Sequence, residues 1–280
     1  MINLDRETLV KMIDHTQLSV HSGEKKIAGL CSEARRFGVW AVCVNGAYTR
    51  FAREQLEGSG VLVCTVAGFP LGAGTSCAKA YEAGDAVRNG AAEIDMVINV
   101  GALRDGRFGL VRDDIRAVVE ASRPALVKVI LETCYLTDEE IVTGCRLSVE
   151  AGAKFVKTST GFGAFGALPA HVRLMRQTVG MEIGVKAAGG IRNFKDAWRL
   201  IQAGASRLGM SASVGVIEEL ELLKIAPAAW LDEEIACHVC PSRFASPDKQ
   251  PKEVFEYHRR KCQACPYVEK IQQILRIEKT

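Results

Sequence analysis

The chain has 280 residues, of which 48% are hydrophobic and 25% are charged, and its formal net charge is +3. This composition is typical of a globular protein and excludes a mainly disordered chain, and the small charge predicts no nucleic-acid partner. No apolar run approaches the ~20 residues of a membrane span, and the first residues lack a secretory core, which predicts a cytoplasmic location and no membrane partner.

Up to about residue 225, short apolar runs alternate with longer segments of helical periodicity. Helices are predicted over residues 24–37 and 137–150, and Asn-Gly or Ala-Gly pairs at 89–90, 151–152 and 203–204 predict helix ends. The predicted strands are residues 12–14, 39–44, 61–66, 93–98, 126–131, 154–157, 183–186 and 206–210.

Alternating strands and helices predict an α/β fold with parallel pairing and right-handed crossovers. Eight such units in about 225 residues match a (β/α)8 TIM barrel, and continuously apolar strands are typical of a sheet buried on both faces. An open, doubly wound sheet is the alternative. The sequence therefore predicts a barrel over residues 1–225 and a small cysteine-rich module over residues 226–280.

Four ionisable residues lie in these otherwise apolar strands. Asp14 is on the first and Asp95 on the fourth, and Lys157 and Lys186 end the sixth and seventh. Because the C-terminal ends of barrel strands converge on the active site, the two lysines should lie close together. Their mutual repulsion and partial desolvation would lower a lysine pKa, and a neutral lysine forms a Schiff base with a carbonyl. The alternative is a buried Lys–Asp ion pair without chemistry, but this combination at converging strand ends favours function.

Several blocks of sequence carry a resemblance to a known family. By their length and order, the chain resembles the deoxyribose-phosphate aldolase family of class I aldolases, (β/α)8 barrels, from about Ile13 to about Glu218. The blocks are Ile13-Asp14-His15-Thr16, Ala41-Val42-Cys43-Val44-Asn45, Gly68-Phe69-Pro70-Leu71-Gly72, the segment 93–103 (EIDMVINVGAL), Lys128-Val129-Ile130-Leu131-Glu132-Thr133, the segment 155–162 (FVKTSTGF) and the segment 184–192 (GVKAAGGIR).

The resemblance implies that Lys157 is the Schiff-base lysine, that Lys186 lowers its pKa and that Asp95 takes part in proton transfer. It implies reversible cleavage of 2-deoxy-D-ribose 5-phosphate to acetaldehyde and D-glyceraldehyde 3-phosphate, with no metal or organic cofactor in catalysis. The substrate-binding residues expected from the resemblance and the loop pattern are Asp14, Thr16, Cys43, Thr160, Gly189, Gly190, Arg192, Gly209 and Ser211.

Gly189 and Gly190 after the seventh predicted strand and Gly209 near the end of the eighth favour a phosphate site. Phosphate sites in barrels use backbone amides of the last two loops. Arg192 adds a charge there and Ser211 a hydroxyl group, although tight turns alone would explain Gly189-Gly190. The chain departs from the family at Ala212, where a second serine is common, and in the loop 162–168, which is bulkier. These departures keep open a Schiff-base aldolase of a different aldehyde or sugar.

Two further patterns have competing interpretations. Gly161, Gly163 and Gly166 spell G-x-G-x-x-G, but no acidic residue follows the next strand, so we reject a dinucleotide site. His15 is expected to be a structural hydrogen-bonding residue, and a Cys43–His15 dyad is the alternative.

The tail contains two C-x2-C pairs, Cys237/Cys240 and Cys262/Cys265, separated by twenty-one residues. Four thiolates in two pairs suit a structural zinc ion in a zinc-ribbon-like module, and an iron–sulfur cluster or free thiols are the alternatives. A helix near 268–277 is expected to pack on the module or a partner. The module could mediate homo-oligomer or protein contacts, and a third hypothesis makes the barrel a scaffold for a zinc-dependent partner-binding element.

Overall fold

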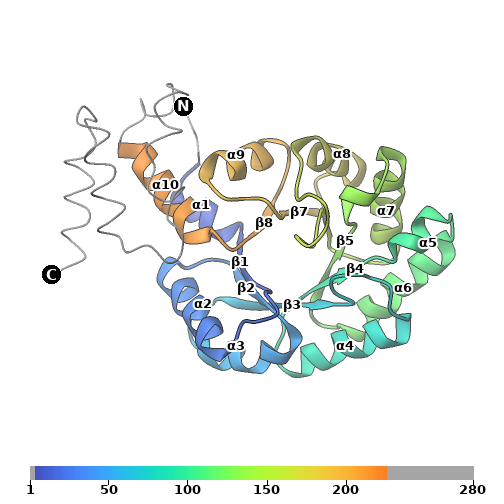
Figure 1. Ribbon diagram of the computed structural model, residues 1–280, viewed down its shortest axis with the longest axis horizontal. Coiled ribbons are helices and arrows are strands. Elements are labelled where there is room, and N and C mark those ends of the chain that lie inside the picture. Colours follow the sequence, from blue (N-terminus) through green and yellow to red (C-terminus); the bar gives the residue numbers. More distant parts are fainter. Residues whose placement is uncertain (1–3, 226–280) are drawn as a thin grey trace. The chain divides into compact units, whose positions relative to one another are not determined.

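The structure, a computed structural model, describes residues 4–225, and the cysteine-rich module predicted over 226–280 lies outside the described residues. Eight parallel strands close into a barrel in the order β1 to β8 (Figure 1). The predicted barrel is confirmed and the alternative of an open sheet is wrong, because β1 pairs with β8. The strands are β1 Ile13–Gln17, β2 Ala41–Val44, β3 Leu62–Ala67, β4 Glu93–Val97, β5 Leu126–Ile130, β6 Phe155–Lys157, β7 Gly184–Ala188 and β8 Arg207–Met210.

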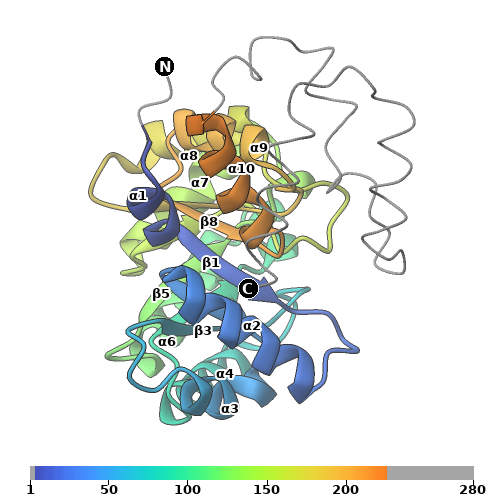
Figure 2. The same ribbon diagram turned by 90° about the vertical axis from the view of Figure 1, so that its left-hand side faces the viewer.

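Helices surround these strands in both ribbon views (Figures 1 and 2). All eight predicted strands are confirmed, although β1 continues past Asp14 to Gln17 and β7 continues past Lys186 to Ala188. The helical elements are α1 Arg6–Lys11, α2 Glu24–Phe37, η1 Gly46–Tyr48, α3 Thr49–Gln55, α4 Ser76–Arg88, α5 Val100–Arg104, α6 Phe108–Ala121, η2 Thr133–Tyr135, α7 Asp138–Glu150, α8 Pro169–Val179, α9 Phe194–Gln202 and α10 Ser213–Ile225.

Local sequence signals account for the helix boundaries. Thr137 and Glu140 form a reciprocal capping box at the start of α7, so the predicted start of this helix is confirmed. The predicted helix ends are also confirmed, since Gly90, Gly152 and Gly204 follow α4, α7 and α9 with positive φ angles. No helix in the described part of the chain is both long enough and apolar enough to cross a membrane.

The two-residue alternation of the strands decides which side chains enter the barrel. Every residue of β4 is buried, and Glu93 and Asp95 share one face of this strand. The register aligns Asp95 with Lys128 on β5 and Lys157 with Lys186 across β6 and β7. These pairings place charged residues of neighbouring strands side by side in the sheet.

An aromatic layer packs against the charged interior. The Arg207 guanidinium lies 4.8 Å from the ring centroid of Trp40 and 5.3 Å from that of Phe155. A Cβ on Gly184 would lie only 2.1 Å from the Phe155 ring, so only glycine leaves room for it. Cation–π contacts and burial together hold Arg207 in place.

Candidate active site

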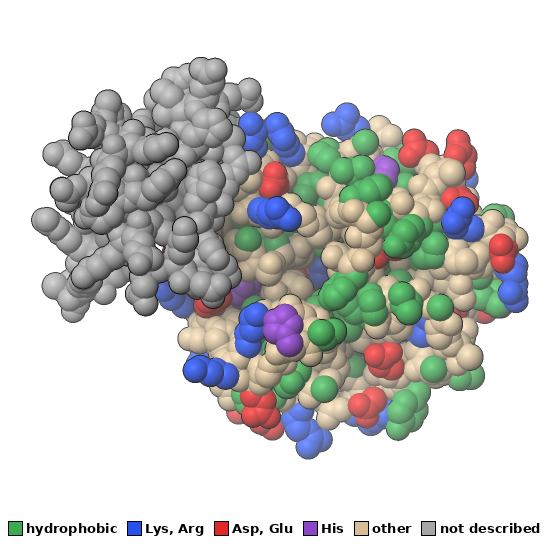
Figure 3. All heavy atoms as spheres, in the orientation of Figure 1, with side chains coloured by type: hydrophobic (Ala, Val, Ile, Leu, Met, Phe, Trp, Pro, Cys, Tyr) green, Lys and Arg blue, Asp and Glu red, His purple; other side chains and the backbone are tan. Residues whose placement is uncertain are grey.

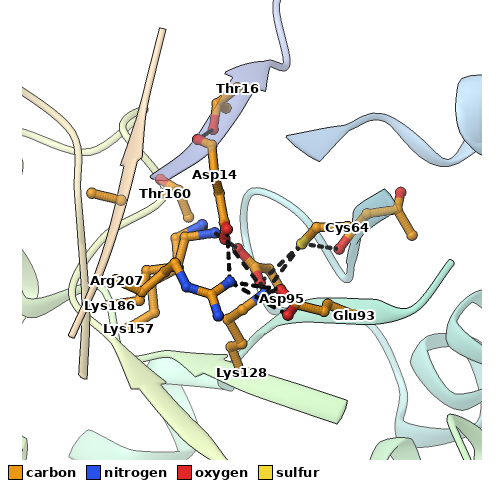
Figure 4. Close-up of polar contacts among 12 residues, drawn as sticks. Asp14, Thr16, Cys64, Glu93, Asp95, Lys128, Lys157, Thr160, Lys186 and Arg207 are labelled. Atoms are coloured by element: carbon orange, nitrogen blue, oxygen red, sulfur yellow. Dashed lines mark hydrogen bonds and ion pairs between the residues drawn. The ribbon is translucent and has the colours of Figure 1, made fainter. Parts of the chain in front are cut away.

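Seven ionisable side chains from six strands form one buried cluster inside the barrel. Figure 4 shows these side chains pointing toward one another. Ion pairs connect all of them, and none is more than 5% exposed. The members are Asp14 on β1, Glu93 and Asp95 on β4, Lys128 on β5, Lys157 on β6, Lys186 on β7 and Arg207 on β8.

The two lysines predicted to lie together share one carboxylate oxygen. Lys157 Nζ donates to Asp95 Oδ2 at 2.8 Å, and Lys186 Nζ donates to the same atom at 2.7 Å. The two nitrogens therefore lie within two hydrogen-bond lengths of each other. Register explains this contact, because Lys157 and Lys186 are direct partners on adjacent strands. The structure thus brings together the three residues that the sequence singled out.

Lys186 has a second carboxylate partner, Asp14 Oδ2, at 2.5 Å. Burial by itself would lower the pKa of Lys186, but the charges of Asp14 and Asp95 outweigh it and raise the pKa above its usual range. This direction is opposite to the effect expected from lysine–lysine repulsion alone. Lys186 is therefore a fixed cation beside Lys157.

Lys128 and Glu93 also belong to the site, although the sequence alone did not single out either of them. Lys128 Nζ lies 2.5 Å from Glu93 Oε2, 2.8 Å from Asp95 Oδ1 and 3.5 Å from Asp14 Oδ2. Burial would lower the pKa of Lys128, but these carboxylates raise it well above its usual range. A lone lysine in the apolar run 126–131 was the signal that could have identified it.

Arg207 completes the cluster from the last strand. Its Nη1 lies 2.8 Å from Asp14 Oδ1 and 3.1 Å from Glu93 Oε2, and Glu93 also accepts a hydrogen bond from Trp40 Nε1. Every carboxylate in the cluster therefore has at least two cationic partners. Such pairing is what allows charges to remain buried.

The aspartates are held ionised by their neighbours. Burial would raise the pKa of Asp14, but Lys186, Lys128 and Arg207 lower it to about 2. Burial would likewise raise the pKa of Asp95, and Lys128, Lys157 and Lys186 hold it well below its usual range. Both carboxylates thus accept hydrogen bonds as anions at neutral pH.

The depressed pKa values predict a specific loss of stability in acid. A carboxylate with a lower pKa in the folded state stabilises the fold above its unfolded pKa, near 3.9, and the effect is lost as the pH falls through the folded value. For Asp14, with a folded pKa of about 2, this contribution is about 2 kcal/mol and disappears between about pH 4 and pH 2. Urea titrations across this range should show a smaller pH slope for Asp14→Asn than for the native protein.

Asp105→Asn is the matched control, since this aspartate is exposed and outside the cluster. The control should keep the native slope. Equal slopes for Asp14→Asn and the native protein would contradict the assigned coupling.

The remaining pocket residues expected from the resemblance lie around this cluster. Thr16 lies along β1 beyond Asp14 (Figure 4), and its hydroxyl donates to the Asp14 carbonyl. Cys43 is fully buried and lies opposite Thr16 and Cys64 in the register. Thr160 follows β6, and its hydroxyl group donates a hydrogen bond to Glu132, which the sequence alone did not single out.

The expected phosphate residues occupy two loops. Gly189 and Gly190 follow β7 with φ angles of 84° and 79°, so both need the conformational freedom of glycine. Arg192 is exposed in the same loop, and Ser211 is exposed in the turn between β8 and α10. An exposed cation and hydroxyl group on adjacent loops can receive an anion.

Gly209 has an additional role that the sequence did not predict. It lies within β8, and a Cβ there would come within 2.9 Å of Lys186 Cε and 3.1 Å of Ala188 Cβ. Its missing side chain therefore makes room for the Lys186 stem next to Asp14. This position adjoins the lysine cluster.

The glycines of the G-x-G-x-x-G segment allow the β6–α8 loop to pack closely against its neighbours. A Cβ on Gly166 would lie 2.1 Å from the Gly189 carbonyl oxygen, and Ala167 N donates to that oxygen at 3.0 Å. A Cβ on Gly163 would lie 2.6 Å from Cys134 Sγ. The glycines therefore let this loop approach the turn after β7 and the end of β5 closely.

Apolar side chains gather on the face of the barrel that is visible in Figure 3. Phe162, Phe165 and Leu168 of the β6–α8 loop are all at least 40% exposed. The Phe162 ring meets Phe69 of the β3–α4 loop edge to face, with centroids 5.4 Å apart. The bulky loop residues noted in the sequence are therefore accessible beside the strand ends.

His15 is a structural residue, as predicted. Its Nδ1 lies 3.0 Å from Ser213 Oγ and its Nε2 lies 2.8 Å from Glu33 Oε2, so it links β1, α2 and α10. The alternative Cys43–His15 dyad is wrong, because both ring nitrogens have other partners.

Two groups of possible metal ligands occur among residues 4–225, Cys43/Cys64/Asp95 and Asp14/Cys64/Glu93. Lys128 Nζ lies 3.3 Å from Cys64 Sγ and also contacts Asp95 and Glu93. The ammonium group thus lies among these ligand atoms as their counterion.

The closed barrel and this cluster define a (β/α)8 protein with a buried lysine–carboxylate centre. The family described as DeoC/LacD family aldolase matches residues 8–217. A deoxyribose-phosphate aldolase of Streptococcus pneumoniae serotype 19F (strain G54) is 57% identical over 210 residues, covering 75% of this chain and 96% of that protein. The chain therefore belongs to the DeoC/LacD aldolases, which makes it a lyase.

Solved structures agree with this assignment. The deoxyribose phosphate aldolase from Aeropyrum pernix, described as a tetramer, has a TM-score of 0.74 and 33% identity, covering 78% of this chain and 93% of that one. QR15, described as an aldolase, also has a TM-score of 0.74, with 37% identity over 80% of this chain and 99% of that one.

Proposed function

We propose that this protein is a deoxyribose-phosphate aldolase that reversibly cleaves 2-deoxy-D-ribose 5-phosphate to acetaldehyde and D-glyceraldehyde 3-phosphate. Lys157 forms the Schiff base, Lys186 supplies a fixed positive charge and Asp95 transfers protons. Catalysis on this proposal needs no metal or organic cofactor.

The charge balance of the cluster is the observation that carries this assignment. Four cations, Lys128, Lys157, Lys186 and Arg207, face three carboxylates. The cluster thus has one surplus positive charge, which is costly inside a protein. Among residues 4–225, Lys157 makes one ion pair, whereas Lys128 makes three and Lys186 makes two. Lys157 therefore has the fewest carboxylate partners of the three lysines, and we assign it as the nucleophile.

In the cleavage direction, the Lys157 amine adds to the C1 aldehyde of the open-chain sugar, and one proton is taken up as water leaves, which forms the protonated imine. A base takes the C3 hydroxyl proton while the C2–C3 bond breaks, and its electrons enter the imine to form an enamine. D-Glyceraldehyde 3-phosphate then leaves. Protonation at C2 followed by hydrolysis releases acetaldehyde and restores the amine. Asp95 contacts both lysine nitrogens, so its carboxylate can pass protons at this position, directly or through water.

The substrate phosphate is assigned to the loops after β7 and β8. Gly189 and Gly190 allow close backbone approach, and Arg192 and Ser211 add an exposed cation and hydroxyl group. The proposed pocket beside the lysines is lined by Asp14, Thr16, Cys43 and Thr160. On this proposal, Gly209 lies between this pocket and the phosphate loops.

Borohydride reduction in the presence of 2-deoxyribose 5-phosphate, followed by peptide mass spectrometry, tests the proposal. A reduced adduct on Lys157 is the expected result. If adducts form only with other aldehydes or ketones, a different substrate would be favoured. The exposed side chains of Phe165 and Leu168 support this alternative. No adduct with any carbonyl would favour the barrel as a scaffold for a partner-binding tail.

The location and assembly are part of the same proposal. Cys43, Cys64 and Cys145 are buried free thiols, which suits the reducing cytoplasm. A homo-oligomer is proposed because the Aeropyrum pernix relative is described as a tetramer. A protein partner could instead bind the tail.

We further propose that Cys237, Cys240, Cys262 and Cys265 bind a structural zinc ion, with an iron–sulfur cluster as the alternative. Elemental analysis of the full chain should find about one zinc ion per chain and its loss in Cys237→Ser/Cys240→Ser. Cys31→Ser/Cys77→Ser changes two barrel cysteines and is the matched control. Iron with visible absorbance would favour the cluster, and no bound metal would favour free thiols.

A further inference from the structure

Glu132 has a backbone conformation that is rare for its residue type. It follows β5 with φ 55° and ψ 62°, and it is the one non-glycine residue among residues 4–225 with a positive φ. A side chain in this left-handed region is strained, and such strain persists where the surroundings require a particular residue. The conformation therefore indicates that the Glu132 side chain has a specific task.

The carboxylate of Glu132 is buried, since the residue is only 3% exposed. Its Oε2 accepts hydrogen bonds from both Thr160 N, at 3.1 Å, and Thr160 Oγ1. Its Oε1 lies 3.7 Å from Cys134 Sγ. No lysine, arginine or histidine in the described part of the chain forms an ion pair with it, so these donors alone satisfy the buried carboxylate.

Thr160 connects the Glu132 carboxylate to the β6–α8 loop. The Thr160 hydroxyl oxygen accepts a hydrogen bond from Phe162 N at 3.0 Å, which fixes the first turn of the loop. Gly163 then passes directly over Glu132, since a Cβ there would lie 3.1 Å from Oε1. Farther along, Ala167 N binds the Gly189 carbonyl. A continuous set of contacts therefore runs from Glu132 to the turn after β7.

The backbone around Glu132 lies close to Lys157. Leu131 N donates to the Lys157 carbonyl at 2.9 Å, and Thr133 N donates to the Thr158 carbonyl at 3.0 Å. The backbone on both sides of Glu132 is thus bound to the end of β6. The left-handed turn at Glu132 directs its carboxylate across this strand end toward Thr160.

We propose that Glu132 is a positioning residue that orders the β6–α8 loop against the Gly189 turn and thereby sets the binding of phosphorylated substrate. It acts through Thr160 and the loop and does not contact the reacting atoms. This inference rests on the proposed aldolase function. It predicts that losing the carboxylate weakens binding of the phosphorylated sugar and leaves imine formation at Lys157 with small aldehydes intact.

Three substitutions of Glu132 distinguish a positioning role from an effect on the stability of the fold. Glu132→Ala removes the carboxylate and keeps the strain, whereas Glu132→Gly removes the carboxylate and relieves the strain. Glu132→Gln keeps the shape and one acceptor oxygen. On our proposal the alanine and glycine variants share the same kinetic defect, although the glycine variant is the more stable of the two.

The experiment measures three quantities in the full chain. These are KM for 2-deoxyribose 5-phosphate, kcat, and the rate of borohydride-trapped adduct formation between acetaldehyde and Lys157. For Glu132→Ala and Glu132→Gly we expect KM to rise about 10-fold to 100-fold, the range for a lost hydrogen bond to a charged group. The acetaldehyde adduct should form at the native rate. Glu132→Gln should recover most of the native KM.

Two results would overturn the inference. One is a native KM in a folded Glu132→Ala or Glu132→Gly variant. The other is a glycine variant whose KM and stability return to native values together, because stability alone would then explain the residue. The native protein tests the proposed function independently of Glu132. If the native protein neither cleaves 2-deoxyribose 5-phosphate nor forms the adduct, the proposed function itself is rejected.

Discussion

Replacement of Lys157 by methionine is expected to abolish turnover without destabilising the protein. Methionine has a similar length but has no amine to form the imine, so kcat should fall by about four orders of magnitude or more. Lys157→Arg should fail equally, because a guanidinium remains charged and does not form an imine. The steady-state rate of 2-deoxyribose 5-phosphate cleavage measures the activity of both variants.

The stability of Lys157→Met is the more specific part of this prediction. Removing the surplus cation leaves three cations facing three carboxylates, and Asp95 keeps its ion pairs with Lys128 and Lys186. The free energy of unfolding should therefore equal or exceed that of the native protein, as is common where active-site groups are kept for function. Substantial turnover in either variant would reject the mechanism. A marked loss of stability would reject the charge balance.

Replacement of Lys128 by methionine should have the opposite effect on stability. Lys128 is fully buried and is paired with Glu93, Asp95 and Asp14. Its loss leaves buried carboxylates with fewer counterions, which should lower the free energy of unfolding by about 3–5 kcal/mol. Urea unfolding measures this quantity.

Lys128→Met/Glu93→Gln is the control for this interpretation. The double variant removes one charge of each sign, so it should recover part of the lost stability through a favourable coupling between the two sites. No recovery would mean that Lys128 acts through packing and not through charge. A double-mutant cycle with Lys128→Met, Glu93→Gln and both together gives the coupling directly.

The sequence by itself determined the architecture and the central residues. Strand–helix alternation and capping signals are local, so α2 was predicted with its observed bounds and all eight strands were located. Lys157, Lys186 and Asp95 were identifiable because charges are rare in buried strands.

Only the tertiary structure decided which charges meet and which positions must be small. Arg207 and Glu93 are 114 residues apart, and Lys186 and Asp14 are 172 apart, so their ion pairs depend on barrel closure and strand register. Gly209 is required because Lys186 passes across it, and Glu132 reaches Thr160 through a left-handed turn. Periodicity predicts which face of a strand a side chain occupies. The partners across the barrel follow from three-dimensional packing, which local sequence does not encode position by position.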